Sequence, residues 1–454
     1  METLVPISDD WRSPEVVVTP FERADRPAVA ALATILAVDL AIFAYVAVRG
    51  FVRQPFSDMF AFLGAEFDFE RGGDLLAYLA SPHNGQHLAW MRMLTALDVQ
   101  AFHGAGAVFL IASSLSILVA ALAPAAELWR GVPVRVVGAI SALLVAMLMI
   151  STLNALDCTQ PINCVYAIAA GFAVLAVVLF EHSASGQGAR VVLFAVLALA
   201  AGLSAAAGSA AGVAVFPALI VSALRHPGHR GLTTASLMVG LAAMAIVLTA
   251  LLGAAPSPAQ VGGNHVGKMA EYFVTYAGMP WSSVRLLSRV RLAIGLVAIA
   301  VGAALVWRGS RRQGDAGRLE RIGLDLILFA IVTAAMAAVG RVDQTDGVIV
   351  PVRYAVFMSV FQVGVVCVLA PEIAERWAGV KRFAVPAALA LALALLAQQV
   401  AAGMSVLQTS QIIRREIADF EAGARRADMR QTIFPDFNYA LRVEAECRRR
   451  GLYQ

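Results

Sequence analysis

The sequence AVAALATILAVDLAIFAYVAVR, residues 28–49, is an almost uninterrupted apolar segment. About 20 such residues cross the hydrocarbon core of a bilayer as a helix. The whole chain matches this segment, because 59% of its residues are hydrophobic, only 15% are charged and its mean hydropathy is +0.74. Soluble domains are about 45–50% apolar and about 25% charged. The sequence therefore predicts an all-α polytopic membrane protein.

Similar apolar segments recur along the chain and predict about eleven transmembrane helices. The predicted spans are residues 28–49, 101–124, 133–153, 163–181, 190–206, 208–224, 231–253, 286–307, 322–340, 353–370 and 383–403. Small residues from Leu203 to Gly212 separate the fifth span from the sixth, so this pair forms either two short helices or one broken helix. Asp39 lies near the middle of the first span, where an ionisable group is costly. It is either a proton relay or a hydrogen-bonded packing residue.

Arginine and lysine in the short loops set the predicted orientation, because cytoplasmic loops are enriched in these residues. The rule places residues 1–27 in the cytoplasm as a short tail, ahead of a transmembrane domain at 28–403. It places the loop at 50–100 and a helical tail at 404–454 in the periplasm of a Gram-negative bacterium, with the chain in the inner membrane. The tail is itself rich in arginine, and it changes sides if residues 190–224 do not cross twice. The net charge of +4 is too small and dispersed to favour nucleic acid.

The cytoplasmic loops are short and contain no Gly-rich phosphate loop or nucleotide-binding βαβ pattern. We therefore expect a substrate that arrives from the lipid phase or the outer aqueous space. Cys158 and Cys164 share one predicted outer loop, where either a disulfide or two free thiols would fit.

The loop at 50–100 is the candidate active-site loop, since connections this long are usually functional and parts of it could lie on the membrane surface as amphipathic helices. Asp58 follows the first span and could act as a general base toward a hydroxyl group, its pKa raised by apolar neighbours. The alternative is that it caps the next helix. Glu66 and Asp68 either share a metal with Asp58 or lie on a solvated helix face.

Other polar residues of the predicted outer side are candidates for substrate binding. His83, Asn84 and His87 could bind zinc, hydrogen-bond a polar substrate or be interfacial structure; no third metal ligand is evident. No metal is assigned, and a divalent ion remains an open alternative. Arg341 and Arg353 flank a short loop and could bind a phosphate bidentately.

Arg285 and Arg289 form a second basic group of the same kind, at the start of the eighth span. For all four of these arginines the alternative is snorkelling toward lipid headgroups.

This arrangement resembles the type C (GT-C) glycosyltransferases, integral membrane enzymes that use sugars linked to polyprenyl phosphate. The resemblance is carried by one span, a long outer loop with an early Asp, many further spans, and the sequences HNGQHLAWMRML, LSAAAGSAAGVAVFPALI and GR followed by VRY. It implies that Asp58 is the catalytic acid of the loop and that Arg341 and Arg353 bind phosphate. Met59 follows Asp58, whereas many members have paired acids, which leaves metal dependence open.

The resemblance predicts a glycosyltransferase of cell-envelope polysaccharide biosynthesis, whose partners are a lipid-linked sugar donor and membrane lipids. One alternative is a polymerase or ligase of lipid-diphosphate-linked polysaccharide, which would use an Arg and His pair without Asp58. Others are a transporter, and a non-catalytic assembly subunit that docks through the outer loop and the helix at Ser405–Arg430. The sequence does not predict an oligomeric state.

Overall fold

The computed structural model describes residues 23–81, 83, 88–183, 214, 265–281, 290–311, 317–341, 350–430 and 432–453. Within these ranges the chain forms helices and no β-strand. Seven of the described helices are long and apolar enough to cross a membrane: α1 (Arg26–Gly50), α5 (Ala107–Gly131), α8 (Cys164–Ser183), α14 (Arg291–Arg311), α15 (Arg318–Arg341), α16 (Ala355–Glu375) and α17 (Trp377–Glu421). The chain is therefore an all-α membrane protein. The predicted spans 190–206, 208–224 and 231–253 lie outside the described residues, so the count of eleven is not confirmed.

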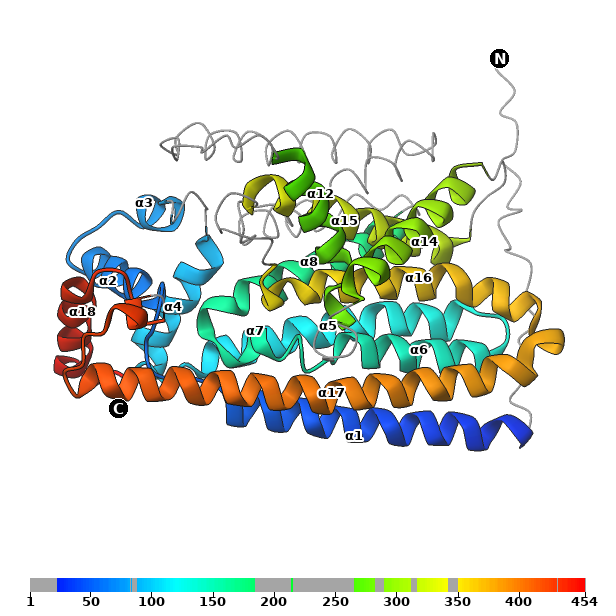
Figure 1. Cartoon of the computed structure of the whole chain (residues 1–454), viewed down its shortest axis with the longest axis horizontal. Coiled ribbons are helices and arrows are strands. Elements are labelled where there is room, and N and C mark those ends of the chain that lie inside the picture. Colours follow the sequence, from blue (N-terminus) through cyan, green and yellow to red (C-terminus); the bar gives the residue numbers. More distant parts are fainter. Residues whose placement is uncertain are drawn as a thin grey trace, which may run out of the picture.

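The long helices lie roughly side by side along the longest axis of the molecule (Figure 1). Small residues allow the closest approach, as expected for helices that pack in lipid. At the contact of α15 with α16, a Cβ added to Gly323 would lie 2.6 Å from the carbonyl oxygen of Gly364, and the reverse distance is also 2.6 Å. The backbones of these two helices therefore touch.

Helix α17 has 45 residues, which corresponds to about 68 Å at 1.5 Å per residue. The hydrocarbon core is about 30 Å thick, so the helix extends well beyond one bilayer crossing. It continues without a break through residue 403, where the sequence suggested the end of a span. Figure 1 shows α17 running past the end of α1, and its last turns bury Ile413, Ile417 and Phe420.

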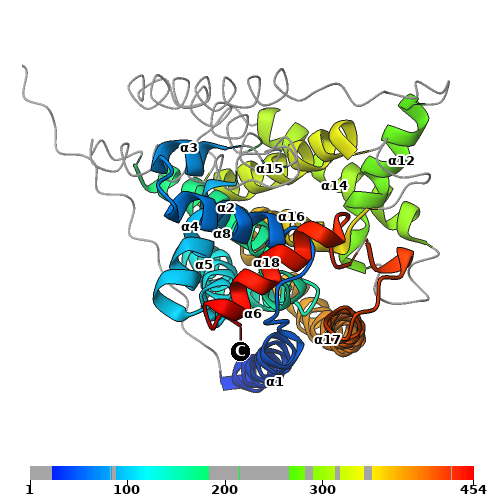
Figure 2. The ribbon, with the colours of Figure 1, turned by 90° about the vertical axis from the view of Figure 1, so that its left-hand side faces the viewer.

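A cap of short helices covers that end of the bundle (Figures 1 and 2). It consists of the end of α17 together with α2 (Met59–Glu70), α3 (Leu75–Ala80), α4 (Ala89–Phe102) and α18 (Phe437–Arg449). Phe60, Leu63 and Phe67 of α2 share one apolar core with Phe420 of α17 and Val443 of α18. The first long loop and the C-terminal tail, which are far apart in sequence, thus fold together as one module.

The predicted second span, 101–124, began too early. Helix α4 continues to Phe102, and the chain then turns through His103 and Gly106, which have φ angles of 50° and 70°. Helix α5 begins only at Ala107. The side chain of Asp98 accepts a hydrogen bond from the Gly106 N–H at 2.8 Å and so holds the turn. Hydropathy alone did not separate this turn from the helix that follows, because its residues are small and only weakly polar.

Helix α6 (Arg135–Met149) has only 15 residues and is followed by a buried irregular turn. Within a membrane, irregular backbone is tolerated only where protein surrounds it or where it lines a water-filled cavity. Gln399 of α17 hydrogen-bonds both this turn and α1. Its backbone oxygen accepts from the hydroxyl of Thr152 in the turn at 2.7 Å, and its side-chain amide donates to the carboxylate of Asp39 in α1 at 3.3 Å. Asp39 is thus buried and hydrogen-bonded through one carboxylate oxygen, as the packing alternative expects. Cys158 and Cys164, in and after this turn, are both free and buried.

Candidate functional site

Asp58 immediately precedes α2, at the end of the segment that connects α1 to α2. Its side chain makes no capping hydrogen bond to that helix. Instead, its Oδ2 atom lies 3.3 Å from Nε2 of His83. The preceding residue, Ser57, has a φ angle of 51°, a costly conformation for a residue other than glycine. Such strained backbone clusters at functional sites. The Asp58 side chain does not cap α2, and its chemical role stays a prediction.

The two members of this pair differ in exposure. The His83 side chain is 16% exposed and packs on the ring of Phe62, with 4.8 Å between the ring centroids. The Asp58 side chain is 38% exposed. A carboxylate that is open on one side and bonded to an imidazole on the other can exchange a proton with a bound hydroxyl group.

Arg92 of α4 is a third polar residue of this region, since it contacts the Phe62 ring on which His83 packs, and the sequence did not single it out. Arg92 is 4% exposed, and its guanidinium carbon lies 5.6 Å from the ring centroid of Phe62 and 5.1 Å from that of Tyr78. Its Nη2 donates to the carbonyl oxygen of Ser81 at 3.3 Å. Helical spacing could have found it, because Arg92 shares the buried face of α4 with Leu88, Thr95 and Val99.

Glu66 and Asp68 do not join Asp58 in a metal cluster. Glu66 is fully buried between α2 and α4, where Gln100 donates to its carboxylate at 2.9 Å. Burial raises the pKa of Glu66, and the hydrogen bonds that it accepts oppose that rise. Asp68 is exposed and pairs with Arg71 at 2.5 Å. Among the described residues, no three His, Cys, Asp or Glu side chains are grouped to hold a metal ion.

Arg353 lies in a short 3-10 helix before α16, inside a cluster of tyrosines. Its guanidinium carbon is 5.6 Å from the ring centroid of Tyr166 and 5.8 Å from that of Tyr354. Asp157, from the short helix α7 (Leu156–Thr159) that follows the buried turn, interacts with the Arg353 charge. Both carboxylate oxygens of Asp157 are buried without a hydrogen-bond partner, and burial raises the pKa of this group while Arg353 opposes the rise. Arg353 is therefore part of a buried polar cluster and does not simply snorkel to headgroups.

The polar groups of the cap and the Arg353 cluster lie at the same end of the bundle. Met91, beside Arg92 on α4, contacts Cys164 at the start of α8 with 3.8 Å between the sulfur atoms. Two residues further on, Tyr166 packs edge-on against Tyr354, with 5.3 Å between the ring centroids. One continuous set of contacts therefore joins α4 to the residues around Arg353.

The structure does not describe the side chains of the other predicted site residues. Arg341 is the last residue of α15, but its side chain lies outside the described residues. Asn84, His87, Arg285 and Arg289 also lie outside them. Their roles in substrate binding stay predictions.

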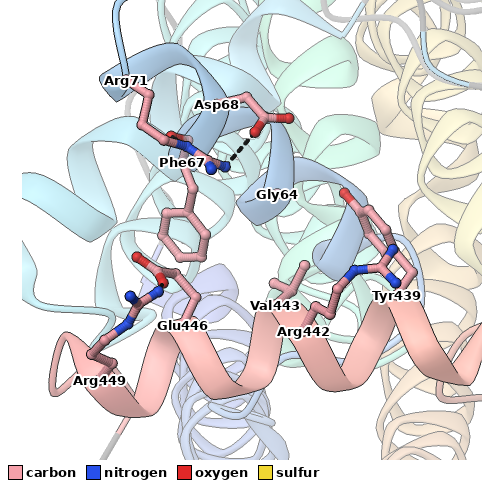
Figure 3. Close-up of a pocket in the computed structure, with 9 residues that line it drawn as sticks. All are labelled: Gly64, Phe67, Asp68, Arg71, Tyr439, Arg442, Val443, Glu446 and Arg449. Atoms are coloured by element: carbon pink, nitrogen blue, oxygen red, sulfur yellow. Dashed lines mark hydrogen bonds and ion pairs between the residues drawn. The ribbon is translucent and has the colours of Figure 1, made fainter.

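A cavity of about 310 Å³ lies between α2 and α18 (Figure 3). Its lining is Gly64, Phe67, Asp68, Arg71, Tyr439, Arg442, Val443, Glu446 and Arg449. The acidic groups of this lining are already paired with neighbouring arginines, Asp68 with Arg71 and Glu446 with Arg449. The charges of this groove are thus largely satisfied within the protein, which makes it a weaker candidate than the Asp58 region.

Fold and site together define a polytopic α-helical membrane protein with a polar site at the junction of its cap and its bundle. Comparison with protein-family models, with characterised proteins and with solved structures found no significant match to this chain. Any function must therefore be argued from the site itself.

Proposed function

We propose that this chain is a membrane glycosyltransferase. It would move a sugar from a polyprenyl-phosphate-linked donor to a hydroxyl group of an envelope glycan or lipid, on the periplasmic side of a bacterial inner membrane. The observation that carries the proposal is the 3.3 Å pair of Asp58 and His83 at the junction of the cap with the bundle. A carboxylate paired with an imidazole is a common arrangement for general-base catalysis. Its position suits a hydrophilic acceptor that meets a donor anchored in lipid.

In the proposed reaction the acceptor hydroxyl gives its proton to the Asp58–His83 pair. The acceptor oxygen then bonds to the anomeric carbon of the sugar, and the bond from that carbon to the phosphate oxygen breaks. The lipid phosphate leaves with the bonding electrons and gains negative charge. Cations placed where this charge develops stabilise the transition state, a role for which Arg341 and Arg353 are the proposed residues.

A second candidate function is the polymerase or ligase of lipid-diphosphate-linked polysaccharide. The observation that favours it is that His83 and Arg92 pack on the same ring, that of Phe62. That chemistry would use an Arg and His pair and would not require Asp58. The two candidate functions therefore differ in whether activity requires Asp58.

The test is to delete the gene and restore it with variants, and then to compare envelope lipids and glycans by mass spectrometry. The transferase proposal expects deletion to accumulate the lipid-linked sugar and remove one glycosylated product. The wild type should restore that product, whereas Asp58→Asn should not. Asp68→Asn is the matched control, since Asp68 is an exposed, paired carboxylate on the same helix.

The pattern of variants separates the candidates. Loss of product with Asp58→Asn supports the transferase. Full product with Asp58→Asn, but none with His83→Gln or Arg92→Met, would favour the ligase. Full product with all three variants would contradict both functions and favour a non-catalytic role.

The proposed orientation has its own test. Single cysteines are introduced at Leu76, which is 75% exposed in the cap, and at Gly317, which is exposed between α14 and α15. A maleimide that cannot cross the inner membrane should label the cysteine at 76 and not the one at 317. The reverse result would place the cap in the cytoplasm.

A further inference from the structure

We propose that Arg92 binds a phosphate-type anion, the phosphate monoester or diester of a ligand that enters where the cap meets the bundle. The inference rests on the proposed function, because the lipid-linked donor is the expected source of that phosphate. It adds a binding role for Arg92, a residue that lies in the quoted sequence HNGQHLAWMRML but to which the resemblance to the GT-C enzymes assigned no role.

The charge of Arg92 is not neutralised within the described part of the chain. A guanidinium stays protonated in proteins, and a buried charge without a partner is costly. Arg92 is 4% exposed, yet Nε and Nη1 have no hydrogen-bond partner. No ion pair with a described acidic residue involves it, and the adjoining residues 82 and 84–87 contain no Asp or Glu.

Glu66 and Asp98, two buried acids of the cap, form no ion pair with Arg92, although each has one carboxylate oxygen without a hydrogen-bond partner. The carboxylate of Glu66 accepts from Gln100 at 2.9 Å, and that of Asp98 accepts from the Gly106 N–H at 2.8 Å. This separates Arg92 from Arg353, which faces the buried carboxylate of Asp157. At Arg92 an incoming anion would meet two unfilled donors, Nε and Nη1, whereas Arg353 has one unfilled donor, Nε, and lies beside Asp157.

The surroundings of Arg92 hold the guanidinium in place. The rings of Phe62 and Tyr78 lie 5.6 Å and 5.1 Å from its central carbon, within the range of cation–π attraction. Nη2 is held by Ser81. A guanidinium that is fixed before binding loses little conformational freedom when it takes an anion.

The position also suits a donor phosphate. His83 packs on the same Phe62 ring and pairs with Asp58, so the Phe62 ring links Arg92 to the proposed base. Trp90 and Met91, on the same turn of α4, pack on α8 of the bundle. A phosphate whose lipid tail follows the bundle could therefore reach this guanidinium.

A purely structural role makes the opposite prediction about stability. If Arg92 only braces Ser81 and the two rings, Arg92→Met should lower the melting temperature of the ligand-free protein. If the unpaired charge serves a ligand, Arg92→Met should leave that temperature unchanged or raise it, because a costly buried charge is removed while most of the side-chain volume stays.

The experiment uses the purified full-length protein in uncharged detergent. Thermal unfolding is measured with farnesyl phosphate, with farnesol as the uncharged match, and with glycerol 3-phosphate as a soluble phosphate ester. We expect farnesyl phosphate, but not farnesol, to raise the melting temperature of the wild type. Arg92→Met should bind farnesyl phosphate about tenfold more weakly or worse. Arg448→Met, which removes an exposed arginine paired with Glu444, should bind like the wild type.

Each outcome decides the proposal. Stabilisation by farnesyl phosphate alone supports a lipid headgroup as the source of the anion, and equal stabilisation by glycerol 3-phosphate supports a soluble phosphate ester. Binding of farnesyl phosphate by Arg92→Met as tightly as by the wild type overturns the inference, as does absence of binding to the wild type. If Arg92→Met does not fold, Arg92→Lys decides: weaker binding supports the inference and unchanged affinity overturns it.

Failure of this inference can be told apart from failure of the proposed function. Asp58→Asn should bind farnesyl phosphate like the wild type while it loses transfer. If Asp58→Asn abolishes transfer but Arg92→Met binds normally, the transferase stands and only the role of Arg92 is rejected.

Discussion

Gly64 of α2 lies directly beneath the hydroxyl group of Tyr439 of α18, so closely that a Cβ atom at Gly64 would overlap that hydroxyl. Figure 3 shows the Tyr439 side chain reaching from α18 toward α2 near Gly64. The first long loop and the C-terminal helix therefore pack closely against each other. Arg450, just after α18, also pairs with Glu70 at the end of α2.

Gly64→Ala should loosen the contact of α18 with α2, because an added methyl group must displace the tyrosine ring. Overpacking of this kind costs about 1–3 kcal/mol. We expect a lower melting temperature and faster cleavage of the C-terminal tail by protease. Gly379→Ala is the control, since a Cβ at Gly379 meets no neighbouring atom. Wild-type protease resistance in Gly64→Ala would contradict the observed docking of α18.

Gln399→Ala should destabilise the bundle itself. The Gln399 side chain serves the Asp39 carboxylate and the Thr152 N–H, both buried, so its removal leaves them unpaired. Orphaned buried polar groups cost about 1–3 kcal/mol each. Thermal unfolding in detergent should show a drop of several degrees. Gln411→Ala, on the exposed face of the same helix, should show little change, and equal effects of the two variants would rule out this bridging role.

Asp98 should make the cap less stable as the pH rises. Burial raises the pKa of Asp98 from 3.8 to about 6, against the hydrogen bonds that it accepts. Between these values the unfolded chain has lost the proton while the folded chain keeps it, so the folded state binds more protons and stability falls with rising pH. The loss should begin above about pH 4, be complete slightly above pH 6 and reach at most about 2 kcal/mol after solvent screening.

Asp98→Asn keeps an oxygen for the Gly106 N–H but cannot ionise. The difference in melting temperature between this variant and the wild type should therefore be small near pH 4 and grow toward pH 7, with Asn the more stable. A difference that does not depend on pH would show that folding does not raise the pKa of Asp98.

The cysteines should be unreactive in the folded protein. All four are buried and free, and for Cys158 burial is the main cause of a raised thiol pKa, which leaves little thiolate to react. We expect no labelling by maleimide before denaturation and four labelled thiols after it. Peptide mapping without reductant should show no link between Cys158 and Cys164; such a link would contradict the structure.

Local sequence predicted the membrane class and many of the spans. The predicted span at 163–181 lies almost entirely within α8, Cys164–Ser183, and that at 322–340 lies within α15, Arg318–Arg341. These agreements follow from physics that acts locally, because each segment of about 20 apolar residues enters the bilayer on its own hydrophobicity. The errors fell at helix ends, such as the start of α5, where turn geometry decides and hydropathy changes little.

For the candidate site, sequence position alone singled out Asp58, and with it the hypothesis of a loop carboxylate at the membrane boundary. It did not distinguish a base from a helix cap, because both need an acidic residue at that place. The structure shows that the Asp58 side chain makes no capping hydrogen bond and lies 3.3 Å from His83, and its role as a base stays a proposal.

By itself, then, the sequence determined an α-helical membrane protein with a long polar loop after its first span, since hydropathy and loop length are properties of neighbouring residues. Only the tertiary structure decided that this loop folds with the C-terminal helix, that Gln399 supports the break after α6, and that Arg92 is buried against the Phe62 ring on which His83 packs. Each of these depends on contacts between segments separated in the sequence. Such contacts form when the helices pack, and no local pattern encodes them.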